Sequence, residues 1–223
     1  MHPIRRTLLA FLALAAFAPG AGAVLEGSGN AATVSRAAKG MTAVALAVPA
    51  DLELVQGPQE GLTLTGDDNI LRVIQTVVED GVLRIRFRSG EEPVRTRSRI
   101  RIRLEMRDIQ GISVAGSGRI TAAALAVPRL KVSLSGSGDV TLAGKAERLD
   151  ANISGSGSLR AGRLETRHTW VSVAGSGDAE LWARATLNAS LAGSGTVRYF
   201  GDPKVDRQVA GSGSVTRAGA APG

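Results

Sequence analysis

The chain of 223 residues contains no cysteine, only two histidines and few aromatic residues, which together make up 3% of it. Without thiols it has no disulfides, thiolate metal sites, iron–sulfur clusters or cysteine nucleophile. An α-helical or α/β domain ordinarily carries more large core side chains and less glycine. These absences exclude most classes of enzyme, and we expect no catalytic residues, no metal and no cofactor.

The N-terminus has the layout of an export signal. Arg5 and Arg6 precede an apolar run from Leu8 to Ala18, and Ala21-Gly22-Ala23 follows it. This order is typical of a secretory signal peptide, which we predict over residues 1–23. The alternative is a retained signal anchor, although 11 apolar residues are too few to span about 30 Å of hydrocarbon. We therefore expect an exported chain without a membrane span, in the periplasm, at the cell surface or outside the cell.

Glycine is abundant, and half of its 28 copies lie in Gly-Ser-Gly tripeptides. Six copies form a series with spacings of 20, 19, 20, 18 and 18 residues, at 116–118, 136–138, 155–157, 175–177, 193–195 and 211–213. A seventh copy, 27–29, lies outside the series. A period near 20 residues with short strands predicts a solenoid. We expect a flexible segment over 24–40, irregular β coils over 41–107, a repeat β-helix over 108–218 and a disordered tail over 219–223.

Apolar and polar residues alternate beside each Gly-Ser-Gly, as in the segment Leu130–Leu134. Successive side chains of a strand point to opposite faces, so stacked repeats form an inward and an outward ladder. The inward ladder is Val114, Leu134, Ile153, Val173, Leu191 and Val209, and the outward one is Ser113, Ser133, Asn152, Ser172, Ser190 and Gln208. Glycine turns the corner because it tolerates positive φ and close approach of the next coil. The pattern predicts an all-β fold, a single-stranded parallel β-helix with about 18–20 residues per coil, right-handed by the usual crossover rule.

Residues 41–107 also alternate but lack the repeat, as at Leu52–Val55, Leu62–Thr65 and Val82–Phe87. Turn signals rich in Gly, Pro, Asp and Asn separate these runs. The apolar segment Ile70–Val78 alternates poorly, and we expect a strand there. Because the terminal repeats of solenoids are atypical, this region is expected to form less regular coils that cap one end.

The series of Gly-Ser-Gly strands over roughly residues 40–217 resembles the bacterial family described as auto-transporter adhesin, head GIN domain. The more specific similarities are Asp68-Asn69-Ile70-Leu71, the segment Glu79–Ile85 and the closing Tyr199-Phe200-Gly201-Asp202-Pro203. The resemblance implies an exported β-helix of the cell envelope. It supplies no catalytic residues.

Arginine occupies every second position of two predicted strands, and we call the set the arginine stripe. Its members are Arg84, Arg86, Arg88, Arg95, Arg97, Arg99, Arg101 and Arg103. Period-2 spacing places each set on one strand face, and if the two strands are neighbours in register, one surface carries eight guanidinium groups. Such a surface suits bidentate contacts with phosphate or carboxylate groups. Nucleic acid is disfavoured as a partner, because no aromatic stacking residues accompany the stripe. The alternative is a solvated face whose charge is offset by Glu79, Glu91, Glu92 and Glu105, and which blocks unwanted strand pairing.

Two aspartates follow Gly-Ser-Gly at equivalent positions, Asp139 and Asp178, with Ser158 between them. Two coils separate them by about 10 Å at ~4.8 Å per strand, close to the carboxylate spacing of inverting glycosidases. Local hydrogen bonding at a turn explains an aspartate there equally well. The other histidine, His2, lies at the extreme N-terminus. His168 therefore has no second histidine for a metal site, and we expect it to be a surface residue. Trp170 and Trp182 fall at outward positions, where they either stack on sugar rings or pack under loops.

The sequence therefore predicts a non-enzymatic, exported envelope protein that acts as an adhesin or a scaffold. Its expected partners are an anionic polysaccharide, lipopolysaccharide or an envelope protein. The alternative is a β-helix enzyme that acts on an acidic polysaccharide, with Asp139 and Asp178 as the candidate carboxylates.

Overall fold

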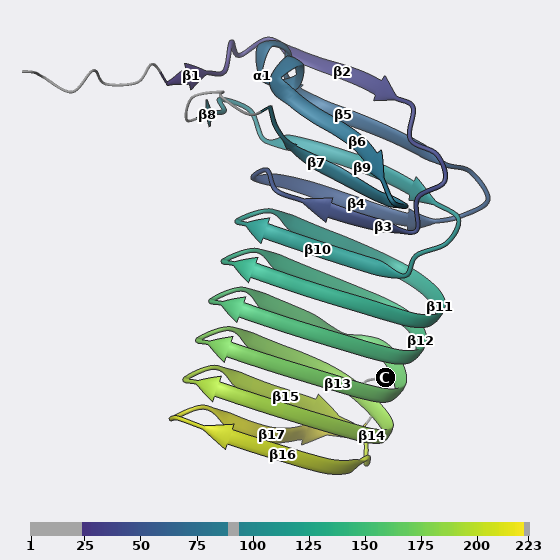
Figure 1. The fold of residues 1–223 in the computed structure, drawn as a ribbon, viewed down its shortest axis with the longest axis vertical. Helices are drawn as coiled ribbons and strands as arrows, with labels where there is room; N and C mark the ends of the chain where they lie inside the picture. Colours follow the sequence, from purple (N-terminus) through teal and green to yellow (C-terminus); the bar gives the residue numbers. More distant parts are fainter. Residues whose placement is uncertain (1–23, 89–93, 221–223) are drawn as a thin grey trace, which may run out of the picture.

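The Gly-Ser-Gly repeats form a stack of β coils in the computed structural model, which describes residues 24–88 and 94–220 (Figure 1). Each strand of the stack pairs in parallel with strands one coil away. The strands are β10 (Gly111–Gly116), β11 (Arg119–Gly136), β12 (Asp139–Gly155), β13 (Ser158–Gly175), β14 (Asp178–Gly193), β15 (Thr196–Phe200), β16 (Lys204–Ala210) and β17 (Ser214–Gly219). The parallel solenoid with 18–20 residues per coil is confirmed.

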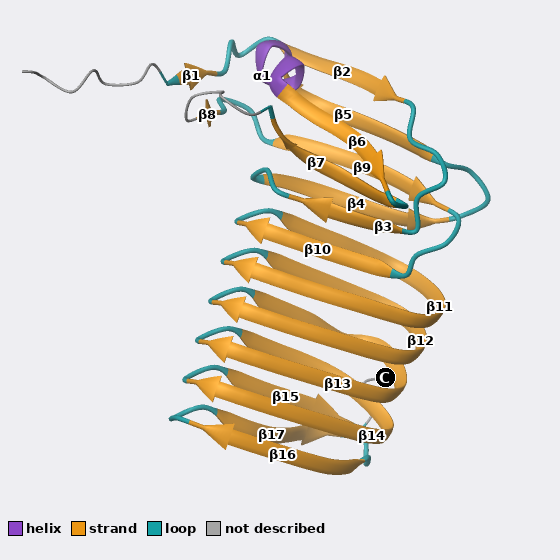
Figure 2. Ribbon diagram, in the orientation of Figure 1, coloured by secondary structure: helices purple, strands orange, loops and turns teal. Residues whose placement is uncertain are grey.

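The solenoid has two broad faces, because β11–β14 each bend around a rounded corner (Figure 2). Their second halves lie beside β10 and β16 and present the outward ladder of serines, so we call this side the serine face. Their first halves lie beside β15 and present Arg119, Asp139 and Arg160, so we call that side the charged face.

The two predicted ladders are in register from coil to coil. Ser113 pairs with Ser133, and the column continues to Gln208. On the inner side, Val114, Leu134, Ile153, Val173 and Leu191 are each at most 2% exposed. Val209, which we expected to be the sixth inward residue, is 43% exposed because no further coil among the described residues covers it.

The Gly-Ser-Gly corner is a ladder of backbone hydrogen bonds. In four of the repeats the serine N–H donates to the carbonyl oxygen of a glycine in the preceding coil, for example Ser176 N to Gly155 O at 2.9 Å. In the last repeat the donor is instead Gly213 N, which bonds to Gly193 O at 3.0 Å. Gly175 has a φ of +118°, and a Cβ placed on it would lie 2.6 Å from Gly155 O. Both the left-handed backbone and the close stacking therefore require glycine at this position.

The opposite, rounded corner absorbs the differences in repeat length. Register shifts occur there between neighbouring strands, as between Ala161 and Glu165 of β13 against β14. The extra residues form a bulge at Gly162, which the side chains of Glu180 and Phe200 cover. Bulges allow coils of 18 and 20 residues to stack without losing register elsewhere.

The N-terminal region extends both faces and then closes the end of the stack. Its elements are β1 (Leu25–Glu26), β2 (Ala31–Arg36), β3 (Ala43–Leu46), β4 (Ala50–Gln56), β5 (Gly61–Asp67), α1 (Asp68–Val73), β6 (Ile74–Glu79), β7 (Val82–Phe87), β8 (Val94–Arg95) and β9 (Ile100–Met106). β3 and β7 continue the serine face in parallel, and β4 and β9 continue the charged face. Antiparallel β6, β5 and β2 follow at the outer edges. The change of strand direction and the short helix, which buries Ile70 and Leu71, form a cap that prevents further parallel stacking.

In three segments the secondary structure differs from the one that we expected from the sequence. Residues 24–40, expected to be flexible, carry β1 and β2, because β2 finds an antiparallel partner in β5. The expected strand over Ile70–Val78 is divided between α1 and β6. Gly219, expected to begin the tail, is the last residue of β17. The predicted signal peptide (1–23) and the end of the tail (221–223) lie outside the described residues.

The seventh Gly-Ser-Gly holds the N-terminal segment against the cap. The carboxylate of Asp67 is fully buried and accepts hydrogen bonds from the N–H groups of Arg97 (2.8 Å) and Ser98 (3.2 Å) and from the Ser98 hydroxyl. Ser28 N donates to Asn69 Oδ1 at 2.9 Å, and the Ser28 hydroxyl donates to Asp68. A Cβ on Gly27 would overlap the Asp67 carboxylate. The motif Asp68-Asn69 thus binds residues 27–29, and we call this set of contacts the Asp67 latch.

The C-terminal end carries an arginine in a core position. Arg207 of β16 is in register with Ala189, and the same column contains Val171, Ala151 and Val132. These four partners of Arg207 are buried. Its guanidinium reaches across the end of the core, where Nη1 donates to the carbonyl oxygen of Val215 in β17 at 3.2 Å. Inward-pointing charge at a sheet edge opposes the addition of further strands.

Candidate binding surfaces

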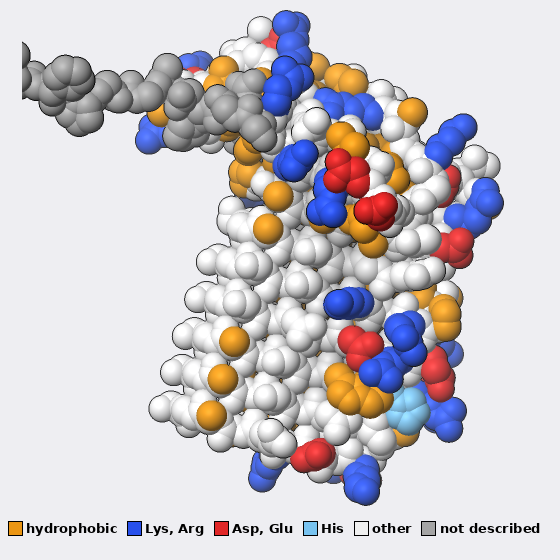
Figure 3. Space-filling view, in the orientation of Figure 1, with side chains coloured by type: hydrophobic (Ala, Val, Ile, Leu, Met, Phe, Trp, Pro, Cys, Tyr) orange, Lys and Arg blue, Asp and Glu red, His pale blue; other side chains and the backbone are white. Residues whose placement is uncertain are grey.

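The first arginines of the stripe lie on the serine face. Arg84 and Arg86 belong to β7 and Arg88 follows it, and all three side chains are exposed. Arg84 forms an ion pair with Glu79 at 2.9 Å, and Arg86 Nε donates to Gln75 Oε1 at 3.2 Å. In the adjacent strands the residues opposite Arg84 are Ala45 and Val77, which are uncharged. Figure 3 shows basic groups at the N-terminal end of this face and a largely uncharged surface along the Gly-Ser-Gly edge.

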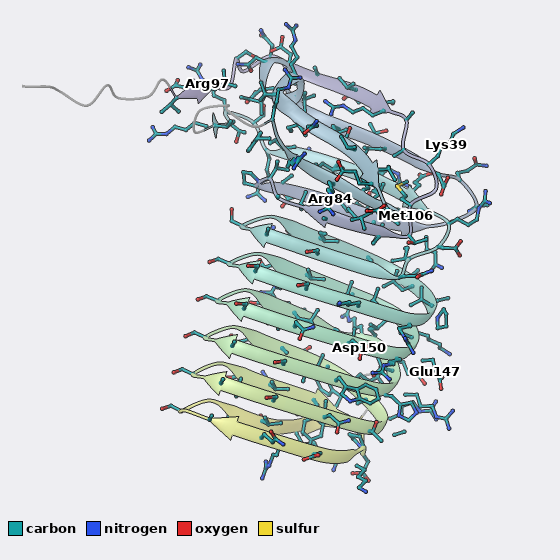
Figure 4. The ribbon with its side chains drawn as sticks, viewed as in Figure 1. Lys39, Arg84, Arg97, Met106, Glu147 and Asp150 are labelled. Carbon is teal, nitrogen blue, oxygen red and sulfur yellow. The ribbon has the colours of Figure 1, made fainter. Side chains whose placement is uncertain are left out.

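The other arginines of the stripe lie elsewhere, because β9 pairs with β4 and β5 while β7 pairs with β3 and β6. Arg101 and Arg103 are on the charged face, and Arg95 is in β8 beside β1. Figure 4 shows Arg84 over the strands of the serine face and Arg97 beside β1, far from it. The two arginine runs are therefore not neighbours, and the eight guanidinium groups do not share one surface.

Most arginines of the second run are paired with acidic side chains. Ion pairs join Arg97 to Glu26 at 3.4 Å, Arg99 to Asp51 at 3.0 Å and Arg103 to Glu53 at 2.9 Å and Glu105 at 3.1 Å. The contacts with Glu105 and Glu53 raise the pKa of Arg103. Glu105 and Glu79 thus offset the stripe as the alternative interpretation predicts, whereas Glu91 and Glu92 lie outside the described residues. The main counter-charges, Glu26, Asp51 and Glu53, come from strands that sequence reasoning did not connect with the stripe.

Charge alternates along the charged face from strand to strand. One column reads Arg101, Asp51, Arg119, Asp139 in register across β9, β4, β11 and β12. Arg119 lies 3.4 Å from Asp51 and 3.3 Å from Asp139. Opposite charges on directly neighbouring strands stabilise a sheet modestly, and they leave little net charge to attract an anion.

Asp139 and Asp178 occupy the positions that the repeat predicts, two coils apart in one column with Ser158 between them. The Asp139 carboxylate is held by Arg119 at 3.3 Å and Arg160 at 3.5 Å. Asp178 Oδ1 accepts a hydrogen bond at 3.0 Å from the N–H of Thr196, which lies in the next coil rather than in the same turn. Both aspartates therefore make structural contacts with the neighbouring coils.

Trp170 lies on the serine face next to the rounded corner. The Arg148 guanidinium stacks on one side of the indole, 3.8 Å from the ring centroid, and Arg148 Nε also bonds to Asp150 at 3.0 Å. His168 is partly buried, and its Nδ1 lies 2.9 Å from the Thr186 hydroxyl. Trp182 lies on the other face, where it pairs with Phe200 of β15. The two tryptophans therefore do not form one site.

A shallow groove of about 430 Å³ runs beside Trp170 across β12, β13, β14 and β16. We call it the Trp170 groove and define it by Asp150, Asn152, Trp170, Asn188, Asp206 and Gln208. Asp150, Trp170, Asn188 and Asp206 stand in one outward column. Sequence reasoning placed Asn152 and Gln208 in the outward ladder and proposed a sugar contact for Trp170, but it did not single out Asp150, Asn188 or Asp206. Aligning the repeats on Gly-Ser-Gly would have found its column neighbours.

No helix of the described residues is long and apolar enough to cross a membrane. Within the same residues, His, Asp and Glu side chains form no group of three that could bind a metal ion. Two exposed features offer recognition chemistry: the Trp170 groove and the arginine row of β7, by which we mean Arg84, Arg86 and the following Arg88.

A capped β-solenoid with exposed, regular faces is the class of protein that this geometry defines. The chain belongs to the family "Putative auto-transporter adhesin, head GIN domain", whose model matches residues 40–203. The resemblance inferred from the sequence is thereby confirmed.

Solved structures show the same fold. A "putative adhesin" from Bacteroides fragilis has a TM-score of 0.67 at 22% identity, covering 87% of this chain and 99% of that one. A "putative lipid binding protein" from Parabacteroides distasonis has a TM-score of 0.62 at 22% identity, covering 88% and 100%. A "putative adhesin" from Parabacteroides merdae has a TM-score of 0.55 at 20% identity, covering 87% and 99%. None of these names is that of an enzyme. Among curated proteins, no sequence matches this chain.

Proposed function

We propose that the protein is an exported, non-enzymatic adhesin of the cell envelope that binds anionic polysaccharide or lipopolysaccharide through the arginine row of β7. Export is supported by the predicted signal peptide over residues 1–23 and by the adhesin family. A non-enzymatic role is supported by the ion pairs that hold Asp139.

The observation that carries the proposal is the difference between the two arginine rows. The outward partners of Arg84 and Arg86 on the adjacent strands are Ala45, Val77 and Gln75. Those of Arg101 and Arg103 include Asp51 and Glu53. Arg84 is itself paired with Glu79 at 2.9 Å, so Arg86 and Arg88 are the members of the β7 row that keep their capacity to bind an external anion. In the β9 row, Arg103 is paired with two carboxylates and Arg101 faces Asp51.

The geometry of the row suits a polymer with repeated negative charges. Alternate residues of a strand are about 6.6 Å apart, so Arg84 and Arg86 leave β7 at that interval and Arg88 follows them. Arginine binds carboxylate and phosphate groups in a bidentate manner. Binding that depends on exposed charges weakens with salt, because the screening length is about 10 Å at 0.1 M.

The test compares two double variants that remove equal charge. The variant R86S/R88S changes the β7 row, and R101S/R103S changes the β9 row. Each is titrated with lipopolysaccharide and with polygalacturonate across a salt series. We expect R86S/R88S to weaken binding about tenfold at low salt, equivalent to ~1.4 kcal/mol, and R101S/R103S to have a much smaller effect.

Equal losses in the two variants would mean that net charge alone attracts the polymer and would refute a site at β7. Absence of salt-sensitive binding by the unsubstituted protein would refute an anionic ligand altogether.

A further inference from the structure

We propose that the Trp170 groove binds a neutral oligosaccharide, at a site separate from the arginine row of β7. The groove lies near the C-terminal end of the serine face, and β7 extends the same face at the other end. The proposal does not depend on the proposed function.

The polar side chains of the groove have the chemistry that sugar hydroxyls require. Asn152, Asn188 and Gln208 each offer an amide donor and acceptor in one plane, and Asp150 and Asp206 offer acceptors. A pyranose hydroxyl both donates and accepts, so adjacent hydroxyls pair with such planar groups. Ser172 and Ser190 continue this polar surface along the floor.

The charges of the groove favour a neutral ligand over an anionic one. Its ionisable residues are Asp150 and Asp206. Arg148 forms an ion pair with Asp150 at 3.0 Å and offsets its charge, so the charge that remains in the groove is that of Asp206. The nearest cation in the same outward column is Lys131, one strand beyond Asp150. An anionic sugar or a phosphate would therefore be repelled by the Asp206 carboxylate, while a neutral hexose would not.

Trp170 supplies an aromatic surface whose position is already fixed. Arg148 stacks on part of the indole at 3.8 Å from the centroid and is itself held by Asp150. Trp170 is also one of the residues that line the groove. Apolar C–H groups of a sugar ring pack on such a surface, and a fixed ring loses little conformational entropy when it does so.

The dimensions of the groove fit a short chain. Four strands at intervals of about 4.8 Å span ~14 Å, which is the length of a few linked sugar rings. Because polar side chains recur on each strand, successive rings can meet similar partners. A linear oligosaccharide across the strands is therefore the ligand that the groove accommodates best.

The experiment uses the fluorescence of Trp170 itself. The chain has two tryptophans, so a Trp182→Phe background makes Trp170 the one reporter. This protein is titrated with cellohexaose, xylohexaose, laminarihexaose and mannohexaose, and with hexagalacturonate as the anionic comparison. Asn188→Ala with Gln208→Ala removes two amides of the groove, and Gln110→Ala is the matched control outside it. Circular dichroism verifies the fold of each variant, and calorimetry with unsubstituted Trp182 repeats the affinities.

We expect at least one neutral hexasaccharide to change the Trp170 emission saturably, and the double variant to bind it about tenfold more weakly, ~1.4 kcal/mol. Gln110→Ala and the R86S/R88S variant should bind it as the parent does. No saturable change with any neutral sugar, equal binding by the double variant, or preference for hexagalacturonate would each overturn the proposal. None of these outcomes bears on the β7 row, whose variants are tested with different polymers.

Discussion

Replacing two glycines of the Gly-Ser-Gly series with alanine separates the two reasons for glycine at the corner. Gly116 and Gly175 both have a left-handed backbone, with φ of +92° and +118°. A Cβ on Gly116 would meet no atom within 4 Å, whereas a Cβ on Gly175 would lie 2.6 Å from Gly155 O. Gly116→Ala therefore introduces backbone strain alone. Gly175→Ala introduces the same strain and also a clash with Gly155 of the preceding coil.

The magnitudes follow from these two contributions. A non-glycine residue in a sparsely populated backbone region costs about 1–3 kcal/mol, and both variants lose this amount. Overpacking against a fixed backbone oxygen costs a further ~1–3 kcal/mol, which applies to Gly175→Ala. Since each kcal/mol lowers the melting temperature of a domain of this size by roughly 2–4 °C, Gly175→Ala should melt about 2–12 °C below Gly116→Ala.

Differential scanning calorimetry of both variants measures the difference directly. Ser176→Ala, at an exposed position of the same corner, is the matched control and should change stability by less than about 0.5 kcal/mol. Equal melting temperatures for the two glycine variants would refute the reasoning, because they would show that clearance between coils does not require glycine.

Two further predictions concern the ends of the stack. Arg207→Leu should increase self-association, because it replaces the charge across the open core end with an apolar side chain. Sedimentation at matched concentrations measures this, and an unchanged distribution of species would contradict the role given to Arg207. The second prediction is that the Asp67 latch weakens in acid. The Ser98 hydroxyl, and then the N–H groups of Ser98, Arg97 and Gly29, hold the pKa of Asp67 below its ordinary value of 3.8 against an opposing effect of burial. A lowered pKa stabilises the fold above the ordinary value, and this contribution is lost as the pH falls through the lowered one. Asp67→Asn should therefore melt below the parent at pH 7, and the gap should narrow towards pH 3. A gap independent of pH would show that the carboxylate charge does not matter.

The repeat region was predictable because two independent periods agree in it. Spacing near 20 residues aligns Val114 with Leu134 and Ser113 with Ser133, and period-2 alternation assigns one pair inward and one outward. The structure keeps both assignments. The rounded corner was not predictable, since the bulge at Gly162 has no counterpart at a fixed offset in the other repeats.

The N-terminal half shows that alternation predicts the exposed side of a strand but not the strand with which it pairs. The pattern in Val82–Phe87 identifies the outward side of the strand and therefore the exposure of Arg84 and Arg86. It does not identify the partner strand, because pairing depends on the path of the chain between strands. The chain passes from the serine face at β7 to the charged face at β9, and this crossing divides the arginine stripe.

The in-register stacking also bears on how such a chain can change in length. The strands β12 and β13 both begin directly after a Gly-Ser-Gly and occupy the same place in their coils. Removing residues 139–157 would join Gly138 to Ser158, and each strand at the junction would meet a neighbour of the kind it has now. The cap at one end and Arg207 at the other would be untouched. Loss or duplication of one coil would thus shorten or lengthen the exposed faces by about 4.8 Å. In proteins of this architecture the length of the stack can therefore evolve without any change to its two ends.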